Sequence, residues 1–237
     1  MKIAIIVAME KEFRQLETLL AESRKVNKGK VSFVEGTLFS NEIVMMQCGI
    51  GKVNAAIGVT TLIHYYHPDL VISSGVAGGA SADMEIMDVV VSSECVYHDV
   101  YCGKECAYGQ LLGLPARFKS PQRLVDIASS LHHTYGRVYS GLTVTGDWFV
   151  DDQDKMRTIL GHFPEAKAVD MESCSIAQAC HQHDIPFISF RIISDIPIKD
   201  TDASQYFDFW KTMADGSFEV LKQFLEVISK QTLDCKD

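Results

Sequence analysis

The chain has 237 residues, of which 47% are hydrophobic and 22% are charged, and this composition is typical of a globular protein with a sizeable core. Its formal net charge is −9 without any cluster of lysine and arginine, which argues against nucleic acid or an anionic membrane as a partner. The apolar run near the amino terminus is too short for a secretory signal, and no later run approaches the roughly 18 residues that a membrane helix needs.

Short β-branched runs alternate with helical patterns along the chain, and this alternation indicates an α/β fold. No linker or repeat interrupts it, so we expect one domain over residues 1–237. The seven cysteines are irregularly spaced and favour reduced thiols in a cytoplasmic protein. The expected elements, in chain order, are a strand at 3–8, a helix at 10–22, strands at 31–38 and 42–48, a helix that opens on the glycines at 49–51 and ends at the proline at 68, strands at 70–74 and 88–92, an irregular region at 97–118, a helix at 123–132, a strand at 137–144, a helix at 151–161, a strand at 167–171, a helix at 172–183, a strand at 186–193 and a helix at 204–229.

Polar segments follow several predicted strands, where open α/β sheets bind their ligands. They are "AMEKE" (8–12), the glycine-rich "SSGVAGGAS" (73–81), "TGDWFV" (145–150), "VDMES" (169–173) and "FRIISD" (190–195). Together they supply carboxylates, one arginine and aromatic rings. Each also has a structural interpretation: Glu10, Glu12 and Glu172 suit the positive end of a helix dipole, Asp195 suits a helix cap, and the glycines suit a tight turn.

Metal and thiol chemistry are poorly supported by the spacing of the histidines and cysteines. The "HYYH" (64–67) and "HQH" (181–183) segments lack a second pair with zinc-like spacing, so we expect no metal. Cys102 and Cys106 have no downstream partner motif, and no base is evident for a cysteine nucleophile. The "FDFW" segment (207–210) favours a core position over a lid.

Eight segments in order carry a resemblance to a known family: "AMEKE", "GIGKVNAAIG", "SGVAGG", "YHD", "YGQ", "TGDWF", "AVDMES" and "RIISD". The chain resembles the bacterial 5′-methylthioadenosine/S-adenosylhomocysteine nucleosidases from Met1 to about Leu225. The resemblance implies the three-layer nucleoside phosphorylase-like fold, with a central mixed twisted sheet flanked by helices. It also implies hydrolysis of the N-glycosidic bond without a cofactor, which releases adenine and a 5-thio-substituted ribose.

The resemblance also implies roles for individual residues. Asp195 would protonate adenine N7 and Glu12 would activate the water, as general acid and base. Glu172 would bind the ribosyl hydroxyls, and its hydrogen bonds would strengthen as positive charge develops on the ring. The further substrate-binding residues would be Met9 and Ile50 beside the 5′-thioether, Val76 near the water and the ribose, Phe149 and Val150 at the base, Met171 against the ribose, Arg191 at the water site, Ser194, and Phe207 over the base.

The resemblance further implies a homodimer, in which residues around Tyr101–Leu114 complete the neighbouring site. Two departures stand out: Val76 replaces a small hydroxyl residue that is frequent in relatives, which we expect to alter rate or affinity, and Asp170 replaces a frequent Glu and has no assigned contact. Three alternatives stay open. They are a phosphorylase of the same superfamily, a futalosine hydrolase, and a non-catalytic nucleoside-binding protein.

Overall fold

The computed structural model describes residues 1–199, 204–212 and 218–231. Its strands are β1 (Lys2–Val7), β2 (Ala21–Lys28), β3 (Val31–Leu38), β4 (Asn41–Gln47), β5 (Leu70–Gly79), β6 (Val89–Tyr97), β7 (Phe118–Lys119), β8 (Val138–Thr145), β9 (Ala166–Asp170) and β10 (Phe187–Asp195). Its helices are α1 (Glu10–Glu17), α2 (Lys52–Tyr66), α3 (Gln122–Ser129), α4 (Gln153–His162), α5 (Ser173–Gln182), α6 (Ser204–Thr212) and α7 (Glu219–Ser229).

The described strands form one mixed sheet in which β5 has a central place. Strand β1 pairs in parallel with β4 and β5, and β2, β3 and β4 form an antiparallel edge. Strand β5 also pairs with β10 in parallel and with β9 in antiparallel direction at its carboxyl end. Through β10, β6, β8 and β9 the pairing returns to β5, so this half of the sheet closes on itself. Several parallel strands therefore end at the same edge.

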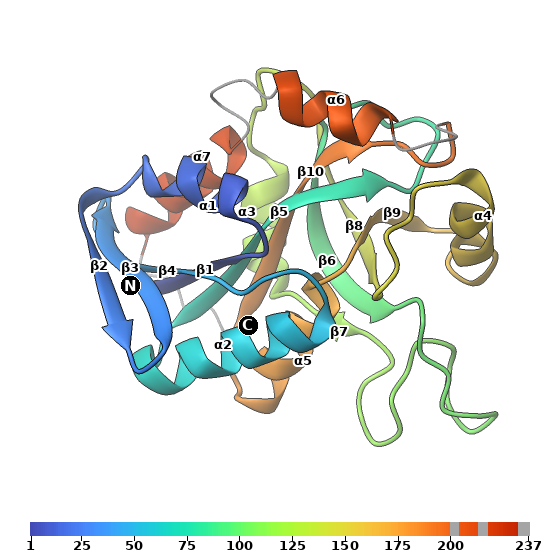
Figure 1. Cartoon of the computed structure of the whole chain (residues 1–237), viewed down its shortest axis with the longest axis horizontal. Helices are drawn as coiled ribbons and strands as arrows, with labels where there is room; N and C mark the ends of the chain where they lie inside the picture. The colour runs from blue at the N-terminus through green and yellow to red at the C-terminus, as the bar shows by residue number, and fades with distance from the viewer. Residues whose placement is uncertain (200–203, 213–217, 232–237) are drawn as a thin grey trace.

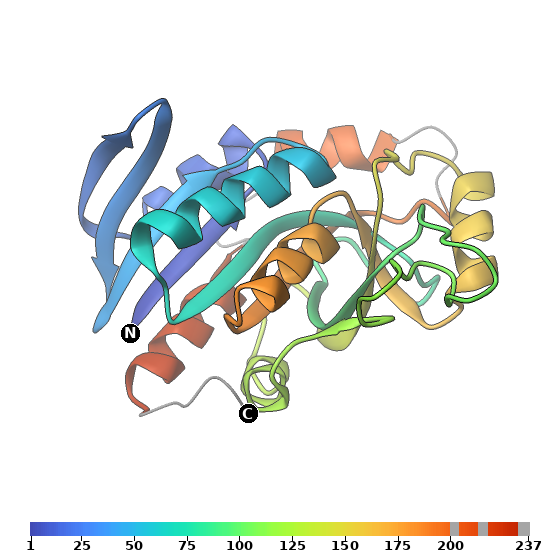
Figure 2. The same cartoon turned by 90° about the horizontal axis from the view of Figure 1, so that it is seen from below.

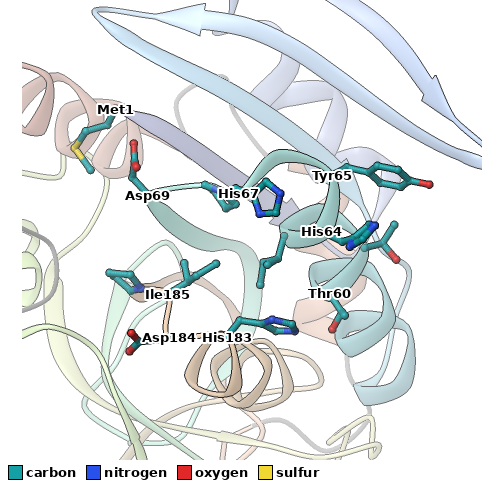
Figure 3. A pocket seen from close by; sticks show the side chains of 13 residues that line it. Met1, Thr60, His64, Tyr65, His67, Asp69, His183, Asp184 and Ile185 are labelled. Carbon is teal, nitrogen blue, oxygen red and sulfur yellow. The ribbon is translucent and has the colours of Figure 1, made fainter.

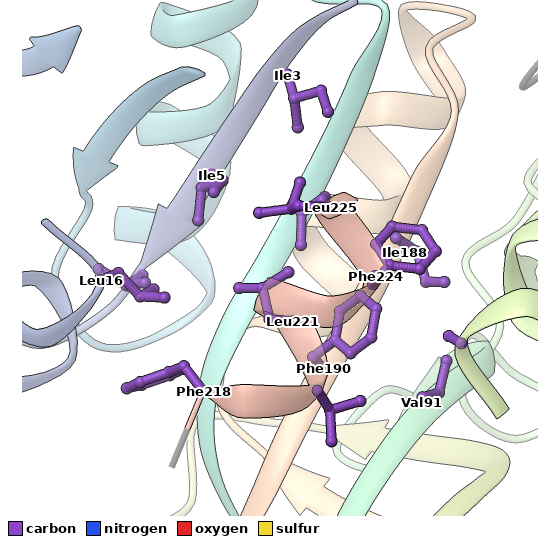
Figure 4. Close-up of a cluster of buried hydrophobic side chains, with 14 of the residues drawn as sticks. Ile3, Ile5, Leu16, Val91, Ile188, Phe190, Phe218, Leu221, Phe224 and Leu225 are labelled. Atoms are coloured by element: carbon purple, nitrogen blue, oxygen red, sulfur yellow. The ribbon is translucent and has the colours of Figure 1, made fainter. Parts of the chain in front are cut away.

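Helices cover both faces of the sheet (Figures 1 and 2). Helices α2 and α5 lie side by side on one face, and α1, α3 and α7 pack on the other. Strand β1 has apolar side chains on both faces, and each face needs a cover. Ile3 and Ile5 lie in the core with α7, and Ala4 and Ile6 lie in the core with α2. A strand that is buried on both faces reads as an unbroken apolar run. Figure 4 shows the first of these cores, in which Phe224 lies against Phe190 of β10.

Two predicted helices were wrong in their extent. The helix at 10–22 ends at Glu17, and residues 21–28 form β2, a strand that the sequence did not reveal because its side chains are mostly exposed and polar. The helix at 204–229 is two separate helices, α6 and α7 (Figure 1). The signal that could have revealed the break is the "DGS" at 215–217 of the sequence, which is typical of a turn. Residues 213–217 lie outside the described ranges.

The glycine-rich segment was also predicted wrongly, as a turn. Residues 75–79 continue β5, which pairs with β10 as far as Gly78. Gly75 is required by a close approach: a Cβ atom there would lie 2.6 Å from both Arg191 Nη1 and Glu12 Oε1. Gly75 therefore lets two buried charged groups lie against β5.

The α/β fold with a central mixed sheet between helices is confirmed. The prediction of one domain over residues 1–237 stays a prediction, since it includes residues outside the described ranges. None of the helices in the described part of the chain has the length and apolar character to cross a membrane.

Candidate active site

A cavity opens where β1, β5, β8, β9 and β10 end, at the edge that the sequence singled out. Its walls come from segments far apart in the chain, which the parallel strands bring together. The lining residues are Ala8, Met9, Glu12, Ile50, Val76, Ala77, Gly78, Trp148, Phe149, Val150, Val169, Asp170, Met171, Glu172, Ser194, Asp195 and Tyr206.

Glu12 is a buried carboxylate held by backbone donors. It lies in the first turn of α1, and its Oε2 accepts a hydrogen bond from Met9 N–H at 2.9 Å. Its Oε1 accepts another from Val76 N–H of β5 at 3.0 Å. Burial raises the pKa of Glu12 above its ordinary value of 4.5, while the charge of Arg191 and the backbone donors lower it. The group is thus fixed in position and poised to accept a proton.

Arg191 lies fully buried in the middle of β10, beneath the cavity. Its Nε lies 2.7 Å from Asp170 Oδ2, and its Nη2 donates to Ser73 Oγ at 2.8 Å. Burial opposes the positive charge, but the neighbouring carboxylates, Asp170 first, raise the pKa of Arg191 overall. Asp170 is therefore the counter-ion that holds Arg191, a role that its position in the sequence did not reveal.

Glu172 directly precedes α5 and lines the cavity next to the start of α2. Its Oε1 accepts a hydrogen bond from Gly51 N–H at 2.9 Å. Gly51 has a φ of 94°, a left-handed conformation that a glycine adopts without strain. Burial raises the pKa of Glu172 to about 7, against the lowering effect of Arg191 and with a further increase from Asp170. One buried arginine thus lies among several carboxylates.

Asp195 ends β10, lines the cavity and is 4% exposed. Ser194 Oγ lies 2.6 Å from Asp195 Oδ1 and 3.3 Å from the carbonyl oxygen of Ala77, so its single proton lies between two acceptors, of which Asp195 is the nearer. These bonds connect the Asp195 carboxyl group to β5. Its orientation is consequently set by two paired strands rather than by a loop.

Aromatic side chains form the outer wall. Phe149 is 43% exposed, and its ring centroid lies 5.1 Å from that of Tyr206 at an angle of 70°. The Tyr206 hydroxyl donates to Met9 Sδ at 3.7 Å, so α6 contacts both the α1 side and the α4 side of the opening. A flat, apolar ligand edge would fit between such rings.

Most of the predicted site residues come together around this cavity. Arg191 is not in its lining but supports it from beneath. Phe207 is not in its lining either; its side chain is 58% exposed, and Tyr206 of the same helix lines the cavity instead. Tyr206 is three residues before the buried Phe209, so the helical spacing places both on the inward face. That spacing was the signal that sequence reasoning missed.

A second depression lies at the other end of α2 (Figure 3). His64, His67 and His183 border it together with Asp69 and Asp184. It lies beside the amino-terminal end of β5, opposite to the edge where α/β sheets bind ligands. No group of three or more histidine, cysteine, aspartate or glutamate side chains in the described ranges could hold a metal ion.

The family model of the phosphorylase superfamily matches residues 2–226. A 5′-methylthioadenosine/S-adenosylhomocysteine nucleosidase of Anoxybacillus flavithermus is 38% identical over 233 residues, which cover 97% of this chain and 100% of that protein. The S. pneumoniae nucleosidase with the transition-state inhibitor MT-ImmA is 34% identical, with a TM-score of 0.89 and coverage of 96% of this chain and 100% of that one. The Colwellia psychrerythraea 34H enzyme in complex with adenine is 34% identical, with a TM-score of 0.87 and coverage of 95% of each chain. The chain therefore belongs to the phosphorylase superfamily and, within it, to the family of 5′-methylthioadenosine/S-adenosylhomocysteine nucleosidases, which are N-glycosyl hydrolases.

Proposed function

We propose that this enzyme hydrolyses the N-glycosidic bond of 5′-methylthioadenosine and S-adenosylhomocysteine, with adenine and the 5-thio-substituted ribose as products. The observation that carries the proposal is the presence of three buried carboxyl groups, Glu12, Glu172 and Asp195, around one cavity with an aromatic rim. Relatives that bind adenine and a transition-state inhibitor, at 34% identity, support the nucleoside class.

The reaction requires a better leaving group, a stabilised ribosyl cation and an aimed water. Asp195 donates a proton to adenine N7, so that the electrons of the C1′–N9 bond leave with a neutral base. Glu172 accepts hydrogen bonds from the ribosyl hydroxyls, which strengthen as the ring becomes cationic. Glu12 removes a proton from the water whose oxygen forms the new bond to C1′. The two backbone donors on Glu12 orient it for this step.

The remaining lining residues provide binding. Phe149 stacks on the base, and the backbone of Val150 reads its edge, while Met171 packs against the ribose. Met9 and Ile50 receive the 5′-thioether, and Phe207 covers the base if α6 shifts toward it. Val76 contributes its N–H to Glu12 and an apolar side chain to the cavity.

A phosphorylase would need cations that grip phosphate in the cavity, but the charged side chains of the described lining are all acidic. Adenine release from both nucleosides, measured with and without phosphate, tests the choice. We expect equal release without phosphate, with free sugar as product. Release that requires phosphate and yields ribose 1-phosphate would establish a phosphorylase. Futalosine as a third substrate tests the related hydrolase, and no release of any base would favour a binding protein.

We further propose a homodimer in the cytoplasm. Large apolar side chains are exposed on and near α2 and in the loop after β6: Ile50 on the segment before α2, Val53 and Ile57 on α2, and Tyr101 and Leu112 in the loop. Apolar side chains gathered in this way are typical of an interface with a second protein. A second copy would cover Ile50, which lines the cavity, and so narrow the 5′ side of the site. The described cysteines are free thiols, which supports a reducing compartment.

A further inference from the structure

Three charged residues outside the cavity lining form a closed ring of hydrogen bonds. Lys52 Nζ lies 2.8 Å from Asp99 Oδ1 and 2.7 Å from Asp99 Oδ2. The Lys52 backbone N–H donates to Asp147 Oδ1 at 2.8 Å. The Asp147 backbone N–H donates to Asp99 Oδ2 at 2.9 Å, which closes the ring. We call these three residues the Lys52 ring; it joins the start of α2 to the ends of β6 and β8.

The Lys52 ring is tightly packed. The Asp99 side chain is 10% exposed and the Lys52 side chain 22% exposed, so water screens their ion pair less than an open surface pair. A Cβ atom on Gly146 would lie 2.9 Å from Asp99 Cγ and 2.5 Å from His98 Nε2. The backbone before Asp147 therefore lies directly against the Asp99 carboxylate. A glycine is needed there for the ring to close.

The ring touches the site on two sides. On one side, Gly51 N–H donates to Glu172 Oε1, and the next N–H, that of Lys52, donates to Asp147. Both donors lie at the start of α2, where free N–H groups and the helix dipole favour carboxylates. On the other side, Asp147 directly precedes Trp148, Phe149 and Val150, which line the cavity. The adjacent residues Gly51 and Lys52 thus connect Glu172, which is proposed to bind the ribose, to the segment that carries the wall at residues 148–150.

We propose that Lys52, Asp99 and Asp147 are positioning residues that set the separation between Glu172 and the wall at residues 148–150. The proposal rests on the proposed function, in which Glu172 holds the ribose and this wall holds the base. A nucleoside spans both, so its two halves are bound well together only at the correct separation. Adenine alone contacts only the wall and is indifferent to that separation. Positioning errors of about 1 Å cost up to about a hundredfold in rate.

The Lys52→Met variant tests this, because it removes the ammonium group and keeps the backbone donor to Asp147. We expect kcat/KM for 5′-methylthioadenosine to fall about a hundredfold, while the Kd for adenine changes by less than about threefold. Lys52→Arg keeps a cation that reaches Asp99 and restores at least a tenth of the wild-type value. Lys155→Met is the matched control: Lys155 pairs with Asp151 and Asp152 next to the same wall but has no link to Glu172.

Kinetic constants within about twofold of wild type for Lys52→Met would overturn the proposal, as would an equal loss of affinity for adenine and for the nucleoside. Hydrogen–deuterium exchange gives a readout that needs no activity. We expect faster exchange at residues 146–150 in Lys52→Met than in wild type or Lys155→Met, and unchanged exchange would also overturn the proposal. A wild-type enzyme that releases no adenine refutes the proposed function instead. The exchange measurement then still tests whether the Lys52 ring holds residues 146–150 in place.

Discussion

Single carboxyl groups carry the chemistry proposed for this enzyme, and their environments differ. Glu12 is held by backbone N–H groups, Glu172 by one N–H at the start of a helix, and Asp195 by a serine hydroxyl. All three are buried, so none exchanges its protein partner for bulk water without cost. Each can therefore be tested by removing its charge while its shape is kept.

The Asp195→Asn variant should lose at least about a hundredfold in kcat, because an amide cannot protonate the leaving adenine and general acid catalysis contributes about 10²–10⁴-fold. Its melting temperature and circular dichroism should stay close to wild type, since the amide oxygen still accepts from Ser194. Steady-state adenine release measures the rate. Asp83→Asn, at an exposed position, is the control. A turnover near that of wild type would show that Asp195 is not the acid.

Glu172 predicts a pH dependence of activity. Its pKa is raised to about 7, and the proposed role requires the carboxylate, so kcat/KM should fall as the pH drops through about 7. The raised pKa of Glu12 acts in the same direction, because the base must also be ionised. Initial rates with 5′-methylthioadenosine between pH 5 and 9 measure the profile. A flat profile down to pH 5 would contradict it.

The same shift predicts a pH dependence of stability. Between the unfolded pKa of 4.5 and the folded pKa of about 7, the folded state binds more protons, so its free energy of unfolding falls as the pH rises through this window. The shift of Glu172 lowers the free energy of unfolding by on the order of 3 kcal/mol between the two ends of this window. Urea unfolding at pH 5 and pH 8 measures it. The side chain in Glu172→Gln cannot ionise, so this variant should lose less stability than wild type over this range. An equal loss in both proteins would show that Glu172 is not the source of the pH dependence.

At the scale of elements, the buried ion pair connects β9 to β10. Arg191 also contacts Ser173 of α5 and Ser73 of β5, so one guanidinium holds several elements beneath the cavity. Asp170 accepts from Thr145 Oγ1 of β8 at 2.5 Å and from Ser173 N–H at 3.1 Å. Hydrogen bonds thereby connect Asp170 and Arg191 to β5, β8 and α5, beneath the cavity.

Asp170→Asn should lower the free energy of unfolding by about 3 kcal/mol, because it leaves a buried arginine without its closest counter-charge. It should also lower the pKa of Glu172, since the charge of Asp170 raises that pKa, and so shift the acid limb of kcat/KM to lower pH. Urea unfolding and the pH–rate profile measure both effects. The exposed Asp126→Asn on α3 should change neither. An unchanged acid limb with reduced stability would leave Asp170 a purely structural role.

At the scale of the whole molecule, the apolar surface at α2 and the loop after β6 predicts a dimer. Val53 is 68% exposed and Leu112 75% exposed, so glutamate at both positions should dissociate the dimer with little cost to the folded monomer. Sedimentation velocity measures the mass. We expect a raised KM for 5′-thio nucleosides as well, because Ile50 would lose its cover. Tyr135→Glu, beside α3, is the control, and a wild-type monomer would refute the assembly.

The sequence by itself determined the α/β class, the edge of the sheet that holds the site, and the polar segments that follow the strands. It did so because buried parallel strands read as unbroken apolar runs, and because their carboxyl ends collect the ligand-binding residues. The segments that contain Glu12, Glu172 and Asp195 could be chosen on this basis, whereas the choice of these three carboxylates within the segments depended on the family resemblance. The polar strand β2 could not, because its exposed polar residues do not form an apolar run. The break between α6 and α7 was missed although "DGS" at 215–217 is a turn signal.

Only the tertiary structure decided which charges meet. Asp170 and Arg191 are 21 positions apart, and their pairing depends on β9 and β10 lying beside the same stretch of β5. The sequence suggests that Gly75 is a turn residue, but the structure shows that Arg191 and Glu12 occupy the space of a side chain at this position. Lys52, Asp99 and Asp147 form a ring because one helix start and two strand ends converge. Such contacts follow from strand order and register, which one-dimensional patterns do not specify.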